Sequence, residues 1–208
     1  MENIKDIIEK IELNKSELVV LAGRPSTGKT SISLEVAANV LAKENTGVAI
    51  FNLEMSADWC KNRIFCSDAF TDKDGLIIEN LYVDDAPGIS VEEISEKCID
   101  LKKKNDLGLI VIDYFQLLES KTISDTKEEK YKHISSSLKA LAEKLDVCIL
   151  LLSHLSKPKH REPTLKDLNL SKCLIDDASS IFFLNRDSHK NLEILNMKRS
   201  KNGQYIRC

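Results

Sequence analysis

The residues whose types and spacing carry the most specific chemistry form one run near the N-terminus. This run, Gly23-Arg24-Pro25-Ser26-Thr27-Gly28-Lys29-Thr30, matches the pattern G-x-x-x-x-G-K-[ST]. Its glycines let the backbone curl so that N–H groups face phosphate oxygens, and the positive end of the following helix adds to the attraction. Lys29 is expected to neutralise the β- and γ-phosphates of ATP, and Thr30 to bind Mg²⁺ through its hydroxyl. An apolar stretch before the run and a helical pattern after it favour nucleotide binding over a chance glycine-rich turn.

Two acidic residues follow apolar runs and could complete this site. Asp113 ends the run 109–112, and Glu54 follows the run 48–53. Because ligands of open α/β sheets bind at the carboxyl ends of parallel strands, Asp113 is expected to hold Mg²⁺ through water, as a Walker B aspartate does. Glu54 could polarise the water that attacks the γ-phosphate, with a solvated charge at a strand end as the alternative.

A histidine and two basic clusters follow the later apolar runs. His154 comes after the run 147–152, where it could sense the γ-phosphate or simply cap a loop. The segment Lys157-Pro158-Lys159-His160-Arg161 comes next and could bind a phosphate backbone, with a solvated basic loop as the alternative. The cluster Lys198-Arg199-Ser200-Lys201 could place a cation against the nucleotide of a neighbouring subunit, as an arginine finger does.

Composition limits the class of protein. The chain has 208 residues, 42% of them hydrophobic and 30% charged, as in an ordinary single globular domain. No apolar run approaches the ~20 residues needed to cross a bilayer, and the polar first residues do not resemble a secretory signal, so we expect a cytoplasmic protein without a membrane partner. The six cysteines form no C-x-x-C pair, which favours reduced thiols. Because the net charge is −3, nucleic-acid binding must come from a local cluster of positive charge.

Strands that alternate with helices must position these residues. Apolar runs predict strands at 17–22, 48–53, 81–83, 107–112, 147–152, 181–184, 192–197 and 204–207. Helical spacing predicts helices at 4–11, after residue 30, at 55–70, at 90–101 and at 131–145. This alternation predicts an α/β fold with a mostly parallel sheet covered on both faces and an antiparallel C-terminal edge. We divide the chain into a short amphipathic N-terminal helix, residues 1–15, and an ATPase domain, residues 16–208.

Several blocks of the chain resemble the C-terminal motor domain of DnaB-type replicative DNA helicases. ELVVLAGRPSTGKT resembles the P-loop block of that family, FNLEMS its F-S-L-E-M block and LIVIDYFQLL its I-D-Y-L-Q-L block. SSSLKALAEKLDV is similar to S-R-S-L-K-A-L-A-K-E-L-N-V, LLLSHL stands where the family has L-S-Q-L, and RSKNG stands where K-Q-R-N-G is usual. The similarity extends from about Glu17 to Gly203 and includes the block that begins REPTLKDLNLSK.

The resemblance implies a RecA-like P-loop fold and a ring of six identical subunits that hydrolyses ATP at subunit interfaces and moves along single-stranded DNA. It also implies that Glu54 is the catalytic glutamate and that His154 takes the place of the sensor glutamine. Lys201 takes the finger position with Arg199 before it, although a lysine lacks the bidentate fork of arginine. A primase or a helicase loader is the implied protein partner.

The block assigned to DNA contact departs most from the family pattern. Asn169, Leu170 and Lys172 stand where the family has Arg, Glu and Gly. The expected DNA contacts are Lys157, Lys159 and Arg161 of the basic segment together with Lys172, and the expected cofactors are ATP and Mg²⁺. The chain would be either a compact member of the family or a truncated one.

The predicted function is an ATP-dependent DNA helicase motor that acts in replication. One rival is a RecA-like recombinase or regulatory ATPase, which would share the core but lack the I-D-Y-x-Q-L and S-L-K-A-L-A blocks. The other rival is a nucleotide-binding adaptor that unwinds nothing, which the acidic balance and the altered DNA block would favour.

Overall fold

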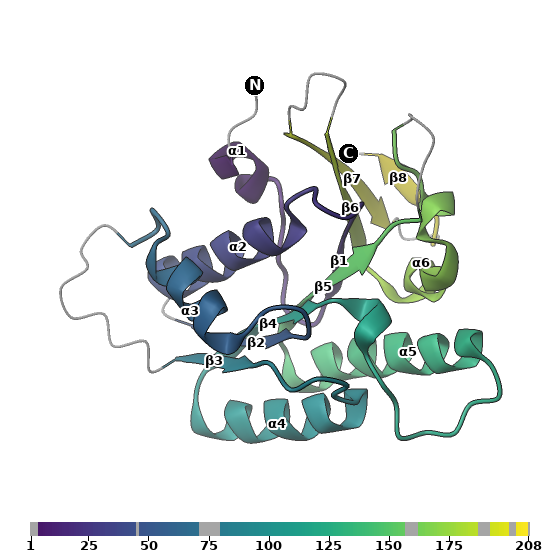
Figure 1. The fold of residues 1–208 in the computed structure, drawn as a ribbon, viewed down its shortest axis with the longest axis horizontal. Coiled ribbons are helices and arrows are strands. Elements are labelled where there is room, and N and C mark those ends of the chain that lie inside the picture. The colour runs from purple at the N-terminus through teal and green to yellow at the C-terminus, as the bar shows by residue number, and fades with distance from the viewer. Residues whose placement is uncertain are drawn as a thin grey trace.

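A single twisted sheet forms the centre of the molecule (Figure 1). The computed structural model describes residues 4–44, 46–70, 80–156, 162–186, 192–199 and 203–207. The strands described are β1 (Leu18–Gly23), β2 (Gly47–Asn52), β3 (Leu81–Asp84), β4 (Leu107–Asp113), β5 (Cys148–His154), β6 (Ser180–Arg186), β7 (Leu192–Arg199) and β8 (Tyr205–Arg207). Within these residues the strand order is β3-β2-β4-β5-β1-β6-β7-β8, in which the first six strands are mutually parallel, β7 is antiparallel to β6 and β8 is antiparallel to β7. The predicted α/β architecture with an antiparallel C-terminal edge is confirmed.

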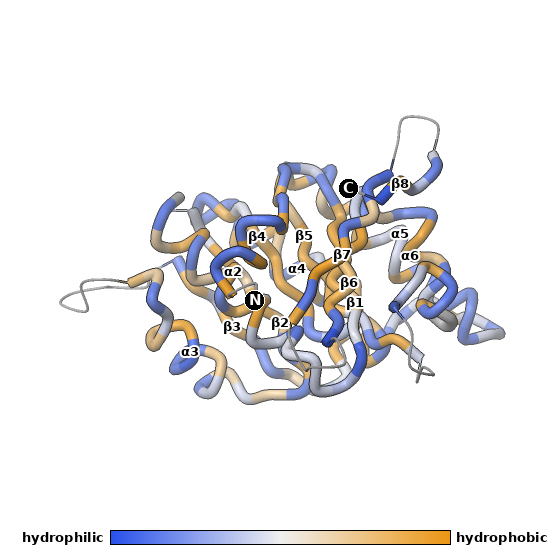
Figure 2. Tube along the Cα trace, turned by 90° about the horizontal axis from the view of Figure 1, so that it is seen from above, coloured by the Kyte–Doolittle hydropathy of each residue, from blue (hydrophilic) through white to orange (hydrophobic). Residues whose placement is uncertain are grey.

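Helices cover both faces of this sheet (Figure 1). The helices described are α1 (Ile4–Glu9), α2 (Lys29–Glu44), α3 (Ala57–Phe65), α4 (Val91–Lys104), α5 (Lys127–Leu145) and α6 (Cys173–Asp177), with two 3₁₀ segments, η1 (Phe115–Leu117) and η2 (Leu165–Ser171). Alternate residues of β1 point to opposite faces: Val20 belongs to the cluster that includes residues of α4 and α5, whereas Val19 belongs to the cluster that includes residues of α1 and α2. Figure 2 shows the resulting hydrophobic band along the central strands.

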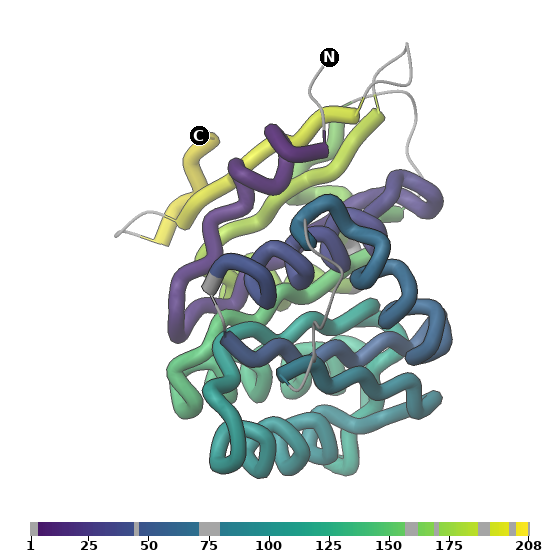
Figure 3. The backbone as a smooth tube through the Cα atoms, turned by 90° about the vertical axis from the view of Figure 1, so that its left-hand side faces the viewer, coloured from purple at the N-terminus to yellow at the C-terminus, as the bar shows by residue number. Residues whose placement is uncertain are grey.

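The N-terminal helix α1 lies beside strand β7 from the C-terminal part of the chain (Figure 3). Ile7 of α1 is fully buried in the same cluster as α2, and Ile194 of β7 packs against that cluster. Lys198 of β7 donates to Glu12 over 2.8 Å. The proposed division at residue 15 remains a prediction. In the part of the chain that the structure describes, no helix has the length and apolar character to cross a membrane.

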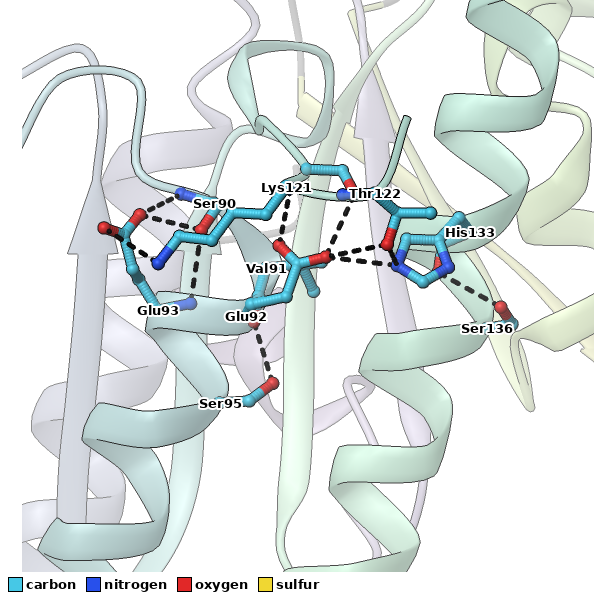
Figure 4. A network of polar contacts seen from close by, with 10 residues as sticks. Ser90, Val91, Glu92, Glu93, Ser95, Lys121, Thr122, His133 and Ser136 are labelled. Carbon is cyan, nitrogen blue, oxygen red and sulfur yellow. Dashed lines mark hydrogen bonds and ion pairs between the residues drawn. The ribbon is translucent and has the colours of Figure 1, made fainter. Parts of the chain in front are cut away.

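A polar network joins the start of α4 to the start of α5 (Figure 4). Ser90 and Glu93 form the capping box that the sequence predicts, each accepting from the other's backbone N–H. Glu92 accepts hydrogen bonds from the backbone N–H of Lys121 at 3.0 Å and from His133 Nε2 at 3.2 Å. Burial alone would raise the pKa of Glu92, but these hydrogen bonds outweigh it and lower the pKa to about 2.

Most predicted elements agree with the structure, and the differences have local causes. The helix predicted to reach Phe70 ends at Phe65, because Cys66 and Ser67 turn the chain with bonds back to Asn62 and Ile64. The short helical segments η2 and α6 were not predicted. The cysteines at 60, 66, 98, 148 and 173 are free thiols, as predicted, and Cys208 lies outside the described residues.

Candidate nucleotide-binding site

The loop between β1 and α2 closes on the carbonyl oxygen of Arg24. Thr27 Oγ1 and Lys29 Nζ donate to this oxygen over 2.8 and 3.0 Å. Ser26 and Gly28 take left-handed backbone conformations, with φ of 61° and 101°, which turn successive N–H groups toward one side, as in anion-binding nests. A Cβ atom on Gly23 would lie 2.8 Å from Thr27 Oγ1, so this tight loop requires glycine at its start.

Lys29 is held inside the loop. Only 5% of its surface is exposed, and burial lowers the pKa of its ammonium group to about 8. The carboxylates of Asp113 and Glu54 oppose this shift because they favour the cation. A phosphate arriving at the loop would favour the cation in the same way.

Thr30 and Asp113 meet at the carboxyl edge of the sheet. Thr30 Oγ1 donates to Asp113 Oδ2 over 2.6 Å. Asp113 is 1% exposed, and its second oxygen, Oδ1, is buried with no hydrogen-bond partner among the described residues. Burial raises the pKa of Asp113, with Glu54 adding to the rise while Thr30 and Lys29 oppose it. A bound cation would relieve both the buried charge and the unused oxygen.

This arrangement fits Mg²⁺ bound together with a nucleotide. In the described part of the chain, no three His, Cys, Asp or Glu residues gather into a metal-ligand cluster. Mg²⁺ in nucleotide sites uses one or two protein oxygens, with phosphates and water as the other ligands. The hydroxyl of Thr30 and the carboxylate of Asp113 provide such a pair, beside the loop where phosphates would lie.

Glu54 stands at the end of the neighbouring strand. The register of β2 and β4 places Asn52 opposite Asp113. Asn52 Oδ1 accepts from the backbone N–H groups of Glu54 and Met55 at 3.0 and 2.8 Å, which fixes the turn that carries the exposed Glu54. Glu54 is close enough to Lys29 and Asp113 to shift both pKa values. Local sequence patterns did not point to this role of Asn52, although a buried amide at a strand end is a detectable signal.

His154 completes the same edge from β5. The register of β1 and β5 pairs it with Gly23, and its ring stacks on Tyr114 with centroids 3.9 Å apart and planes 14° from parallel. Burial lowers the pKa of His154, the positive Lys29 lowers it further, and Glu54 opposes them. The imidazole is therefore neutral at pH 7 and can donate one ring N–H to a phosphate oxygen.

Two residues that were not predicted as site residues, Asn185 and Arg186, approach the loop from the end of β6. Arg24 Nη1 donates to Asn185 Oδ1 over 3.0 Å. A guanidinium nitrogen of Arg186 lies 4.0 Å from the position that a Cβ atom on Gly28 would take. Asn185 and Arg186 end β6, an apolar strand beside β1. A polar residue at the end of an apolar run is the same pattern that identified Glu54 and Asp113.

The structure separates the finger candidate Arg199 from this edge. β7 runs antiparallel to β6, so Arg199 lies beside Ser179 near the start of β1, while the P-loop follows the end of β1. At about 3.3 Å per step, the five steps from Leu18 to Gly23 put roughly 17 Å between the two positions. The guanidinium of Arg199 donates to the carbonyl oxygen of Asp176 in its own chain.

The DNA-binding candidates are placed only in part. Lys172 is exposed and directly precedes α6. Lys157, Lys159 and Arg161 lie outside the described residues, as does the finger candidate Lys201.

Comparison with known families agrees with this geometry. A family described as the DnaB-like helicase C terminal domain matches residues 6–77 and 70–206, which is most of the chain. This chain belongs to the DnaB-like helicase family. The predicted family is therefore confirmed.

The relatives of this DnaB-like chain include replicative helicases of two bacilli. It is 37% identical over 202 residues to the replicative DNA helicase DnaB of Geobacillus stearothermophilus, covering 85% of this chain and 44% of that protein. It is 34% identical over 207 residues to the replicative DNA helicase DnaC of Bacillus subtilis, covering 88% of this chain and 46% of that protein. The chain thus spans less than half the length of these relatives.

Solved structures of similar fold include a DnaB-like replicative helicase described with its interactions with primase, and an ATPase domain of another protein. The first superposes with a TM-score of 0.74 at 26% identity, over 93% of this chain and 58% of the other. The second gives a TM-score of 0.72 at 26% identity, over 94% of this chain and 86% of the other. The RecA-like fold predicted for this DnaB-like chain is confirmed.

Proposed function

We propose that this chain is an Mg²⁺-dependent ATPase and the motor domain of a replicative DNA helicase. The observation that supports this most strongly is the contact between Thr30 and Asp113 beside the buried Lys29. The contact brings together two oxygen groups that can hold nucleotide-bound Mg²⁺ and the ammonium group that can neutralise the phosphates. The loop 23–30 and the end of β4, far apart in the sequence, supply these groups.

ATP binding would be the work of the loop 23–30. Its backbone N–H groups and the start of α2 would contact the phosphates, and Lys29 would neutralise the β- and γ-phosphate oxygens. Thr30 and Asp113 would hold Mg²⁺, which when bound neutralises further charge on the phosphates. Arg186, beside Gly28, would approach the nucleotide from the end of β6.

Hydrolysis would depend on Glu54 and His154. Glu54 projects from the turn that Asn52 fixes, and its carboxylate would accept a hydrogen bond from the attacking water and orient it. The neutral ring of His154 would donate to an oxygen of the γ-phosphate and thereby stabilise the charge that develops there. Positioning and charge stabilisation would supply most of the rate enhancement.

The finger residue would come from a second copy of the chain. Arg199 lies near the start of β1 and cannot reach the nucleotide of its own chain. Arg199 and Lys201 would therefore act on a neighbouring subunit, in a homo-oligomer that we propose is a hexamer. The rings of the resembling family are the support for the number six.

Single-stranded DNA is the proposed track of the motor. The net charge of −3 requires a local basic surface, and the candidates for it are Lys157, Lys159, Arg161 and Lys172. A primase is a proposed partner because one similar structure is described with its interactions with primase. No observation in the structure or the comparisons favours the adaptor or recombinase alternatives.

The proposed function is tested by ATP hydrolysis with and without Mg²⁺ and with and without a poly-dT oligonucleotide. We expect hydrolysis that requires Mg²⁺ and that the oligonucleotide accelerates, and Lys29→Ala should abolish it. Lys43→Ala, an exposed lysine at the far end of the same helix, is the matched control. Hydrolysis that persists in Lys29→Ala would refute the site, and hydrolysis indifferent to DNA would favour the adaptor.

A further inference from the structure

The side chain of Gln116 connects three segments that are distant in the sequence. Gln116 lies in η1, directly after β4 and Tyr114. Its Nε2 donates toward Ser153 Oγ at 3.1 Å, the His154 carbonyl oxygen at 3.0 Å and Ser171 Oγ at 3.0 Å. Its Oε1 accepts from the backbone N–H of His154 at 3.2 Å.

The partners of Gln116 are buried and bonded to one another. Ser153 and Ser171 are both fully buried, and their hydroxyls lie 3.3 Å apart. Gln116 bonds both the N–H and the carbonyl oxygen of His154, so this amide fixes the backbone of His154 on the side away from β1. A shift of His154 must therefore move the amide of Gln116 or break its hydrogen bonds.

Ser171 lies at the junction that leads to Lys172. It ends η2, and Lys172 and α6 follow directly. The segment 165–177 is also anchored elsewhere, because Ser156 bonds the carbonyl oxygen of Asp167 and Ser135 of α5 bonds Asp177. These bonds tie the two ends of the segment to Ser156 and to α5, so a push at Ser171, which lies between them, would be taken up within the segment beside Lys172.

We propose that Gln116 is a positioning residue that couples the nucleotide state at His154 to the segment 165–177, which carries Lys172. This inference rests on the proposed function, since it assumes that a γ-phosphate contacts His154. When that phosphate draws the imidazole toward itself, Gln116 transfers the movement of the backbone to Ser171. ATP binding thereby changes how the segment 165–177 presents Lys172 to DNA.

The chemistry of a glutamine suits this connection. An amide donates and accepts at once, so it can bond the N–H and the carbonyl oxygen of His154 while it also donates to Ser171. Leucine has a similar volume but forms none of these bonds. Gln116→Leu therefore breaks the connection while it fills the same space.

The test is hydrogen exchange of the full chain with and without Mg²⁺ and a γ-thiophosphate analogue of ATP. In the wild type we expect the analogue to change exchange in two places, the loop 23–30 and the segment 165–177. Gln116→Leu should keep the response of the loop and lose at least half of the response of the segment. Gln204→Leu, an exposed glutamine in the C-terminal part of the chain, is the matched control and should respond like the wild type.

A double-mutant cycle on DNA-stimulated hydrolysis separates coupling from general damage. Ser171→Ala should keep its rate without DNA within about twofold and lose most of the stimulation by poly-dT. Gln116→Leu with Ser171→Ala should lose no more stimulation than the worse single variant, because both break one connection. Losses of stimulation that multiply in the double variant would show that the two residues act separately and would overturn the inference.

The outcomes distinguish this inference from the proposed function. A response at 23–30 but none at 165–177 in the wild type, or an unchanged response at 165–177 in Gln116→Leu, overturns the coupling role alone. No response at 23–30 in the wild type refutes nucleotide binding, and the coupling role falls with it. Loss of the segment's response in Gln116→Leu, with the loop's response intact, supports the role.

Discussion

The carboxyl ends of the parallel strands and the C-terminal strand β7 hold their candidate functional residues in different ways. At the ends of β1, β2, β4 and β5, the candidate side chains come from four segments of one chain and lie together, and Thr30 contacts Asp113 there at 2.6 Å. Around β7, the candidate cation Arg199 contacts a carbonyl oxygen of its own α6, and Lys198 pairs with Glu12. The candidate nucleotide site is thus assembled within one chain, whereas Arg199 lies away from it.

Strand direction explains the difference. Parallel strands bring their carboxyl ends to one edge, so residues that follow β1, β2, β4 and β5 meet there. The hairpin from β6 to β7 reverses direction, so Arg199 at the end of β7 lies near the opposite edge. The arrangement predicts that binding of ATP needs one chain and that fast hydrolysis needs two.

The largest effect is expected at the candidate nucleotide site, where one substitution should separate ATP binding from ATP hydrolysis. Glu54→Gln should lower the hydrolysis rate about 10²- to 10⁴-fold, because it removes the carboxylate that orients the water. It should keep ATP affinity within about threefold, because Asn52 still fixes the turn. Steady-state hydrolysis and equilibrium binding of a fluorescent nucleotide measure the two effects. Glu143→Gln, at an exposed position of α5, is the control. Equal losses of binding and hydrolysis in Glu54→Gln would contradict the role assigned to Glu54.

The second prediction concerns Arg199, the candidate finger residue at the end of β7. Arg199→Ala should slow hydrolysis about tenfold to 100-fold at concentrations where subunits assemble, less than the effect of a complete arginine finger, because Lys201 remains. Mixing Arg199→Ala with the inactive Lys29→Ala should restore part of the activity, since some mixed interfaces would contain both intact residues. No gain on mixing, with assembly confirmed by mass in solution, would place Arg199 outside the neighbour's site.

A third prediction follows from the pKa of Lys29, which burial lowers to about 8. A bound phosphate favours the charged ammonium, so the complex has the higher pKa and ATP binding takes up a proton above pH 8. Affinity should therefore be steady below about pH 7.5 and fall as pH rises, by about tenfold at about pH 9. Nucleotide titrations from about pH 6.5 to about pH 9.5 test this. Lys29→Met should bind weakly and without this slope, and the same slope in that variant would exclude Lys29 as its source.

The smallest effect is expected at the network in Figure 4, at the start of α4, which packs in the cluster on the face of the sheet opposite α2. Ser90→Ala removes the cap of α4 and should lower the free energy of unfolding by about 1 kcal/mol. Urea unfolding measures the change, and the urea dependence itself should stay the same. ATP affinity should not change, because α4 packs on the sheet away from the P-loop. A changed affinity would show that the network communicates with the site.

The sequence predicted most of the parallel half of the fold. The runs that became β1, β2, β4 and β5 are almost wholly apolar because both faces are covered, and each ends at or just before a residue of the site. The predicted bounds differ from the observed ones by two residues or fewer. The contact of Thr30 with Asp113 follows from these ends, whereas the catalytic roles of Glu54 and His154 remain predictions.

Contacts that depend on strand order could not be predicted from local patterns. The approach of Arg186 to Gly28 requires that β6 lie beside β1, and the bonds of Gln116 require that η1, β5 and η2 converge. η2 and α6 are too short for a helical repeat of apolar residues to be recognised. The bond of Arg199 to Asp176 depends on how β6 and β7 pair in their hairpin. The sequence predicted this hairpin but not which residues of its two strands lie opposite each other.

The central claim is that a triphosphate lies against the loop 23–30 with a metal on Thr30 and Asp113. A crystal structure of Glu54→Gln with ATP and Mg²⁺ tests this most directly. We expect the γ-phosphate within hydrogen-bond distance of Lys29 and His154, and the metal about 2.1 Å from Thr30 Oγ1. Phosphates bound elsewhere, or a metal that touches neither Thr30 nor the waters beside Asp113, would contradict the account.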